Sequence, residues 1–201
     1  NGSGFWWGGE EWLNARPHYK GGGEMIDEVF MDHSTYAKAP ARFEAGTPAI
    51  AQAIGMGAAI TYLQNLGMER IEAYEHELSD YLYRRLSEVP GITVLGPSDP
   101  QGRAALCTFV CEGIHPSDLS TFLDMEGVAI RAGHHCCQPF HRSLGYSHSA
   151  RASLYFYNTK AHIDTFLQHL QDTLRFFGNL GGGNNDNTAD GEDADEFVPF
   201  I

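Results

Sequence analysis

The residues with the most reactive chemistry lie together in one short run from Arg131 to Cys137. Cys136 follows His134 and His135 directly in this run. Imidazole and guanidinium groups make an electropositive setting, which favours the thiolate over the thiol. Because the thiolate is the nucleophilic form of cysteine, the pattern predicts that Cys136 forms a covalent bond with a substrate.

A second arginine, Arg151, follows this run after a loop. We expect Arg131 and Arg151 to lie at the ends of two strands that flank the loop. A guanidinium presents a planar fork of donors that matches a carboxylate. Two such forks near a thiolate predict an anionic small molecule as the ligand, although each arginine alone could equally be a surface charge.

Histidines and cysteines are also zinc ligands, so a metal site is an alternative interpretation of the same run. His134, Cys136, Cys137 and His141 could supply four ligands. Adjacent histidines and adjacent cysteines lack the gaps, of about two to four residues, that let a chain wrap around a tetrahedral ion. We therefore favour the nucleophile and predict no metal site.

The elements that must position this run are predicted from hydrophobic patterning. The pattern indicates strands over 92–95, 104–111, 128–131 and 152–157, a helix over 116–125 capped by His115 or by the preceding loop, and a helix over 160–177. Strand, strand, helix, strand is typical of an α+β layer. The loop over 132–150 is longer than most connections, and its many His, Cys and Arg residues favour a functional loop.

The chain before this layer is expected to hold two long helices and little else that is regular. We expect a short aromatic strand over 2–8, mostly loop over 16–45 with a β-like piece at 26–31, a helix over 48–66 that Thr47 caps and Gly67 ends, and a helix over 69–89.

Composition limits the partners of this 201-residue chain, whose formal net charge is −13. Without a basic face we expect no nucleic acid and no membrane surface as partners. We also expect no transmembrane helix and no signal peptide. Four cysteines, two of them adjacent, favour a reducing compartment, with Cys107 and Cys111 as apolar filling in a half-buried strand.

Several stretches together resemble the SUF-type (group II) cysteine desulfurases of the class V aminotransferase superfamily, over residues 1 to about 177. Besides the loop from Arg131 to Cys136, the matching stretches are Gly21-Gly22-Gly23-Glu24-Met25-Ile26, Arg42-Phe43-Glu44-Ala45-Gly46-Thr47-Pro48 and Ser149-Ala150-Arg151-Ala152-Ser153-Leu154-Tyr155-Phe156-Tyr157-Asn158-Thr159-Lys160. The last of these is most similar to plastid and cyanobacterial members. The resemblance implies an α/β chain of the pyridoxal-phosphate-dependent transferase fold type I.

The resemblance implies an enzyme that removes sulfur from L-cysteine, leaves L-alanine and holds the sulfur as a persulfide for Fe–S cluster assembly. Cys136 matches the cysteine that carries the persulfide. Arg151 matches the arginine that binds the substrate carboxylate, and Arg131 matches the one beside the substrate. His134 and His135 belong to the same substrate-binding loop.

The cofactor that the resemblance implies is pyridoxal 5′-phosphate, held mainly by another part of the enzyme. Thr47, with Gly46 before it, matches the residue that reaches the cofactor phosphate. The implied partners are L-cysteine, a SufE-like sulfur acceptor, and a second copy in a homodimer or a complementary N-terminal half. The implied location is the plastid stroma or the bacterial cytoplasm.

The sequence departs from the family pattern at two points. Family members carry the Schiff-base lysine in a Ser-x-His-Lys motif, which this sequence does not contain. We therefore expect the C-terminal part of an enzyme, with a remnant of the large cofactor domain over 1–66, an α+β small domain over 67–178 and a disordered acidic tail over 179–201. Cys137 stands where the family usually has a small residue, which leaves open an exchange of sulfur between neighbouring thiols.

Two alternatives to the desulfurase remain open from the sequence. The related selenocysteine lyases share the implied site. A non-catalytic split or paralogous module would bind a sulfur acceptor or the complementary half without turnover.

Overall fold

The computed structural model describes residues 2–99 and 102–181, and it divides the chain into two compact units, Asn1–Met68 and Glu69–Ile201. Most of the acidic tail predicted from residue 179 onward therefore lies outside the described residues. Residues 179–181 belong to the last helix, which ends four residues beyond the predicted end.

The first unit contains short elements and one long helix. Its elements are α1 (Glu10–Asn14), β1 (Ile26–Val29), β2 (Ser34–Tyr36), the 3-10 turn η1 (Ala41–Phe43) and α2 (Ile50–Leu66). The strands β1 and β2 form an antiparallel hairpin, so the β-like piece predicted at 26–31 is confirmed. The aromatic strand predicted over 2–8 is wrong, because this segment has no ladder partner among the described residues and Phe5 and Trp7 are exposed.

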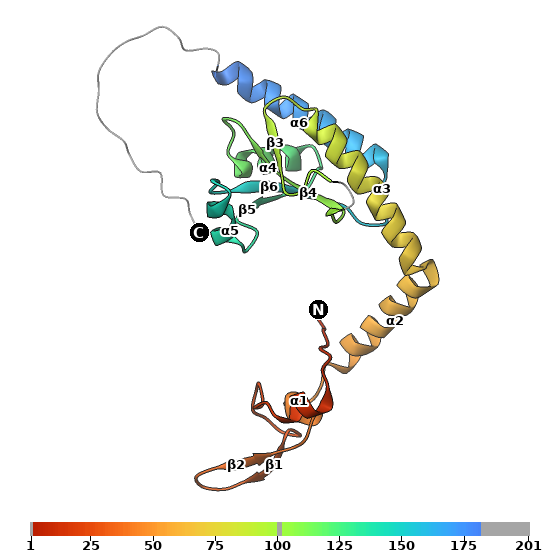
Figure 1. Ribbon diagram of the computed structural model, residues 1–201, viewed down its shortest axis with the longest axis vertical. Helices are drawn as coiled ribbons and strands as arrows, with labels where there is room; N and C mark the ends of the chain where they lie inside the picture. Colours follow the sequence, from red (N-terminus) through yellow and green to blue (C-terminus); the bar gives the residue numbers. More distant parts are fainter. Residues whose placement is uncertain (1, 100–101, 182–201) are drawn as a thin grey trace, which may run out of the picture. The chain divides into compact units, whose positions relative to one another are not determined.

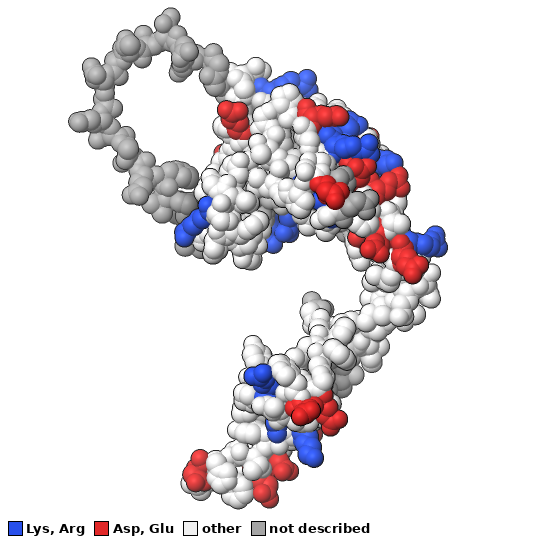
Figure 2. Space-filling view, in the orientation of Figure 1, with Lys and Arg blue, Asp and Glu red and all other residues white. Residues whose placement is uncertain are grey.

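The helix α2 is apolar but has no buried face. None of its residues is buried, and its sequence contains no Lys, Arg, Asp or Glu, which leaves its surface white in Figure 2. The prediction that Thr47 caps this helix is wrong. The residue at the cap position is Ala49, and no side chain makes a capping hydrogen bond there. Gly67 ends it as predicted, with a φ of 91° that suits glycine. Within the described ranges, no helix has both the length and the hydropathy needed to cross a membrane.

The second unit is an α+β layer, as the sequence predicts. Its elements, in chain order, are α3 (Met68–Ser87), β3 (Ile92–Leu95), β4 (Leu106–Cys111), α4 (Pro116–Met125), β5 (Arg131–Gly133), α5 (Gln138–Ser143), β6 (Ser149–Ser153) and α6 (Lys160–Gly181). The four strands form one antiparallel sheet in the order β3-β4-β6-β5. Figure 1 shows α3 and α6 side by side, and Tyr81 of α3 donates a hydrogen bond to Asp164 of α6 at 2.7 Å.

One core fills the space between the helices and one face of the sheet. Side chains of α3, α4 and α6 pack there against alternate residues of β4 and β6. Cys107 and Phe109 of β4 are fully buried in this core, which confirms the role of Cys107 as apolar filling. Because side chains alternate across a strand, Thr108 and Arg151 point to the opposite face of the sheet. The core does not use this opposite face of the sheet, which is therefore available for a functional site.

The predicted elements around the reactive run are partly wrong in position. The strand predicted over 128–131 lies at Arg131–Gly133, and the one predicted over 152–157 lies at Ser149–Ser153. The predicted loop over 132–150 contains a helical turn, α5, with Pro139 in its first turn. Proline suits this position because its missing N–H has no intrahelical partner there. The predicted cap His115 is confirmed, since its ring accepts a hydrogen bond from the Ser117 backbone N–H at 3.2 Å.

Candidate active site

Two arginines lie directly opposite each other on the free face of the sheet. The register pairs Arg131 of β5 with Arg151 of β6, and Arg151 with Thr108 of β4. Directly paired residues project to the same face, so both guanidinium groups belong to the face that the core does not use. Arg131 is exposed and Arg151 is half-buried, and Arg151 Nε is buried without a hydrogen-bond partner among the described residues. An unpaired buried donor of this kind is suited to a ligand acceptor.

Cys136 lies in a tight turn that leaves β5. The Cys137 backbone N–H donates to the His134 carbonyl at 2.9 Å, and the two central residues, His135 and Cys136, have φ values of 51° and 61°. Non-glycine residues in this left-handed region cost about 1–3 kcal/mol each, and such strain is concentrated at functional sites. The turn exposes Cys136 and places its Sγ 3.5 Å from Arg131 Nη2. The structure thus brings the predicted nucleophile and the predicted arginine into contact.

A buried serine links the turn to α5 through hydrogen bonds. Ser149 Oγ lies 3.0 Å from His135 Nε2 and 2.7 Å from His141 Nε2, and Ser149 is fully buried. Burial lowers the pKa of His135, and the positive charge of Arg151 lowers it further. His135 is therefore held as a neutral ring beneath the turn.

His134 is placed by other histidines. Its ring lies 4.3 Å from the ring of His148, measured between centroids, and His148 in turn lies 5.1 Å from His115. Burial lowers the pKa of His148, and His134 and His115 add to this effect. Across residues 2–99 and 102–181, no group of three or more His, Cys, Asp or Glu side chains is arranged to hold a metal ion.

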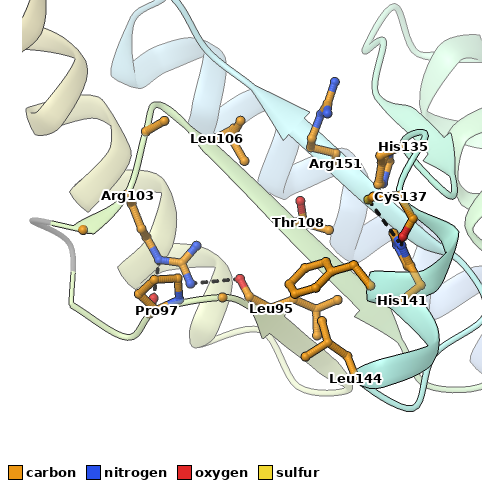
Figure 3. A pocket seen from close by; sticks show the side chains of 14 residues that line it. Leu95, Pro97, Arg103, Leu106, Thr108, His135, Cys137, His141, Leu144 and Arg151 are labelled. Carbon is orange, nitrogen blue, oxygen red and sulfur yellow. Dashed lines mark hydrogen bonds between the residues drawn. The ribbon is translucent and has the colours of Figure 1, made fainter.

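A cavity of about 390 Å³ lies beside the turn on the free face of the sheet. Figure 3 shows His135, Cys137 and His141 gathered at one end, with Arg103 beside Leu95 and Pro97 at the other. The Arg103 guanidinium is engaged in hydrogen bonds within the chain, since it donates to the carbonyls of Pro97 and Leu95. Cys137 lines this cavity, whereas Cys136 does not.

The predicted cofactor residues belong to the first unit. Gly46 has a φ of 78° and its N–H donates to the Gly23 carbonyl at 2.9 Å. Thr47 is exposed just before α2, and its hydroxyl makes no hydrogen bond within the described ranges. No side chain caps α2, whose first N–H group, that of Ile50, donates to the Pro48 carbonyl at 2.8 Å. A free hydroxyl beside an uncapped helix N-terminus fits a phosphate group.

Sequence reasoning missed two residues that shape the site. Ser149 stands fourteen positions from His135, and only the strand register reveals that it lies beneath the turn. His141 was considered only as a metal ligand, but it is 3% exposed and hydrogen-bonded to Ser149. The Gln138-Pro139 pair was the signal for the helix that carries it, since proline is favoured in a first helical turn.

The comparisons with known proteins agree on one family. The family model described as "Aminotransferase class-V" matches residues 1–166. A probable cysteine desulfurase of Synechocystis is 57% identical over 177 residues, which are 88% of this chain and 42% of that protein. A probable cysteine desulfurase of Streptomyces coelicolor is 47% identical with the same coverage. The chain therefore spans less than half the length of these curated relatives.

Solved structures are similar over most of the chain. The cysteine desulfurase CsdA of Escherichia coli, in an S-sulfonic acid form, has a TM-score of 0.77 and 34% identity, covering 85% of this chain and 42% of that one. The apo cysteine desulfurase of Thermococcus onnurineus has a TM-score of 0.76, also at 34% identity, covering 83% of this chain and 42% of that one.

Proposed function

The chain belongs to the class-V aminotransferase family, with the pyridoxal-phosphate-dependent fold type I, and we propose that it supplies the sulfur-accepting thiol and the carboxylate-binding arginines of a cysteine desulfurase. The relatives are named as cysteine desulfurases, which supports L-cysteine as the substrate. Since the chain spans 42% of these relatives, the whole reaction is proposed for this chain together with the remaining part of such an enzyme.

The observation that carries the proposal is the contact between Cys136 and Arg131, the residue paired in register with Arg151. Cys136 Sγ lies 3.5 Å from Arg131 Nη2, and Arg131 is paired in register with Arg151. A thiolate beside a guanidinium is stabilised by the positive charge. A second guanidinium with a free Nε offers a donor to the substrate carboxylate.

The cofactor role belongs to the first unit in this proposal. Thr47 would donate its hydroxyl to the phosphate of pyridoxal phosphate, next to Gly46 and the uncapped start of α2. When bound, pyridoxal phosphate supplies an electron sink that weakens bonds in an amino-acid substrate.

The residues of the second unit would bind and attack the substrate. Arg151 and Arg131 hold the carboxylate of L-cysteine. The Cys136 thiolate forms a bond to the substrate sulfur, the C–S bond of the substrate breaks, and its electron pair stays with carbon, which gains a proton to give L-alanine. His135 stays neutral, because its pKa is lowered by burial, and so keeps its hydrogen bond to Ser149 while the charged groups change.

Finer assignments follow the same proposal. We assign the chain to the SUF-type group, with a SufE-like acceptor, because an exposed Cys136 can be reached by a second protein. The bare apolar surface of α2 and the exposed Phe5 and Trp7 support a homodimer or docking with the rest of the enzyme. The identity to the Synechocystis protein supports a cyanobacterial or plastid affinity, and hence a bacterial cytoplasm or plastid stroma.

The proposal is tested by supplying the part of such an enzyme that the match does not cover. The chain would be co-expressed with the region of the Synechocystis relative that lies outside the match, and L-alanine release from L-cysteine would be measured with pyridoxal phosphate present. We expect Cys136→Ser to abolish release in the presence of an acceptor thiol, while Cys111→Ser, at a half-buried cysteine of β4, keeps it.

The arginines provide a second arm of this test. Loss of one charge-assisted hydrogen bond of about 1.5–3 kcal/mol predicts that Arg151→Ala raises the KM for L-cysteine roughly 10-fold to 100-fold. Arg142→Ala is the matched control, since Arg142 is exposed on α5. Release that is unaffected by both Cys136→Ser and Arg151→Ala would contradict the proposal.

A further inference from the structure

The two adjacent cysteines of the turn have different surroundings. Cys136 is exposed and contacts Arg131 outside the cavity. Cys137 is half-buried, lines the cavity, and places its Sγ 3.1 Å from the His134 carbonyl oxygen and 3.6 Å from His141 Nδ1. One thiol therefore faces the outside of the turn, and the other faces a sheltered space beneath it.

The hydrogen bonds around His141 direct a donor toward Cys137. His141 Nδ1 lies 3.2 Å from the Cys137 carbonyl oxygen, which can only accept, so Nδ1 carries the proton in the arrangement that satisfies both groups. His141 Nε2 then accepts from the Ser149 hydroxyl, which accepts in turn from His135 Nε2–H. The Nδ1–H group is thus fixed on the side where the Cys137 sulfur lies, and it can stabilise negative charge there.

The cavity adds a further donor that suits a sulfur anion. The buried Arg151 Nε–H group, in a residue that lines the cavity, has no partner among the described residues. Apolar side chains of Leu106, Phe140 and Leu144 form other parts of its wall. By contrast, Cys107 lies in the core, where burial raises its pKa to about 11. Cys137 therefore has a polar, partly sheltered setting that a cysteine serving only as apolar filling does not need.

We propose that Cys137 is a second sulfur-carrying thiol, which takes the terminal sulfur of a persulfide on Cys136 and holds it in the cavity beneath the turn. This rests on the proposed function, because that function places the first persulfide on Cys136. The step adds a sheltered storage position to the sulfur path. It also frees Cys136 to accept another sulfur before an external acceptor arrives.

The transfer balances without an oxidant. The Cys137 thiolate attacks the outer sulfur of the Cys136 persulfide, a new S–S bond forms on Cys137, and the S–S bond to Cys136 breaks. Cys136 leaves as a thiolate, and the proton of the persulfide stays on the transferred sulfur. Adjacent Cα atoms are about 3.8 Å apart, and a persulfide lengthens the Cys136 side chain by about 2 Å, so rotation of the two side chains brings the sulfurs within reach.

The test loads sulfur without cysteine turnover. The full chain is pulsed with glutathione persulfide, which gives its outer sulfur to an exposed thiolate and leaves as glutathione thiolate. After removal of the donor, samples are alkylated at successive times, and tandem mass spectrometry locates the extra sulfur on Cys136 or Cys137. We expect the label to appear first on Cys136 and then to move to Cys137, at a rate that does not depend on protein concentration.

Variants separate the relay from direct loading. We expect Cys136→Ala to reduce labelling of Cys137 at least 10-fold, and Cys137→Ala to keep the label on Cys136, where it is lost faster to added dithiothreitol. Cys111→Ala is the matched control that leaves the transfer unchanged. His141→Asn should slow the transfer while leaving the first loading of Cys136 intact.

Three results would overturn the inference. These are a label that stays on Cys136 in the unaltered chain, a Cys137 that loads equally well without Cys136, and release of sulfide with formation of a Cys136–Cys137 disulfide. Because the donor replaces L-cysteine, these outcomes are independent of L-alanine release. A failed desulfurase assay with a successful transfer would therefore count against the proposed function alone.

Discussion

The two units of this chain bury their apolar side chains to very different degrees. The second unit has a continuous core in which three helices pack against one face of a four-stranded sheet. In the described part of the first unit, Met25 is the buried apolar side chain, while Trp7 is 90% exposed and α2 has no buried residue. The second unit therefore stabilises its fold with its own contacts, whereas the apolar surface of the first unit remains free for contacts with other surfaces.

This difference matches the division of the proposed chemistry. The thiols and arginines stand on the sheet of the well-packed unit, where the register and Ser149 hold them in place. Thr47, the proposed contact to the cofactor phosphate, stands in the unit with little core. In this proposal the second unit supplies the groups that handle sulfur, and the first unit supplies the contact to the cofactor phosphate.

The largest expected effect is a difference between two matched phenylalanine substitutions. Phe109→Ala removes a fully buried ring from β4 and is expected to destabilise the second unit by about 3–5 kcal/mol. Phe5→Ala, at a ring that is 75% exposed in the first unit, should change the free energy of unfolding by less than about 0.5 kcal/mol. Urea unfolding followed by far-UV circular dichroism measures both. Equal effects would contradict the contrast between the units.

The optical probes make this contrast measurable within one sample. The three tryptophans, Trp6, Trp7 and Trp12, all belong to the first unit, so fluorescence reports on that unit and circular dichroism reports mainly on the second. We expect the fluorescence change at lower urea concentration than the circular dichroism change. Coincident transitions would indicate one cooperative unit.

A smaller effect is expected from the serine beneath the turn. Ser149→Ala leaves the Nε2 atoms of half-buried His135 and buried His141 without their partner and should destabilise the second unit by about 1–3 kcal/mol. Ser153→Ala, at an exposed serine of the same strand, is the matched control. The same unfolding measurement applies, and a Ser149→Ala variant as stable as Ser153→Ala would mean that the network does not hold the turn.

The smallest effect concerns pH. The pKa values of His135 and His148 are lowered by burial, so the unfolded chain binds more protons than the folded one as the pH falls below the ordinary value of 6.5. The contribution of these two histidines to the free energy of unfolding is therefore fully present above this value, and it decreases on acidification from pH 7.5 to 5.5. We expect His135→Asn to reduce this dependence, as measured by Tm at both pH values.

Local pattern was sufficient to predict much of the second unit. The helical spacing of Ile71, Leu78 and Leu82 predicted α3, and all three side chains are buried. The strands around the turn were displaced by about three residues, because Val128 to Ile130 are apolar but do not pair, whereas Arg131 to Gly133 do. Hydrogen bonding to a neighbouring strand decides the position of a short strand, and a single segment carries no information about its neighbour.

The candidate site was predicted as a set of residues but not as an arrangement. Cys136, His134, His135 and Arg131 are close in sequence, so their meeting was expected. That Arg151 lies opposite Arg131, and that Cys137 faces away from Cys136, depends on register and on the left-handed turn. Non-glycine residues rarely adopt this turn conformation, so the residue types at these positions could not predict it.

The most direct test of the central claim, that the turn prepares one of the four cysteines for nucleophilic chemistry, is a labelling race in the folded chain. Iodoacetamide at pH 7.5, with mass-spectrometric mapping over time, should modify the exposed Cys136 first. Cys111 should react more slowly, since burial raises its pKa, and Cys107 should react only after unfolding. Labelling of Cys107 or Cys111 as fast as Cys136 would contradict the claim.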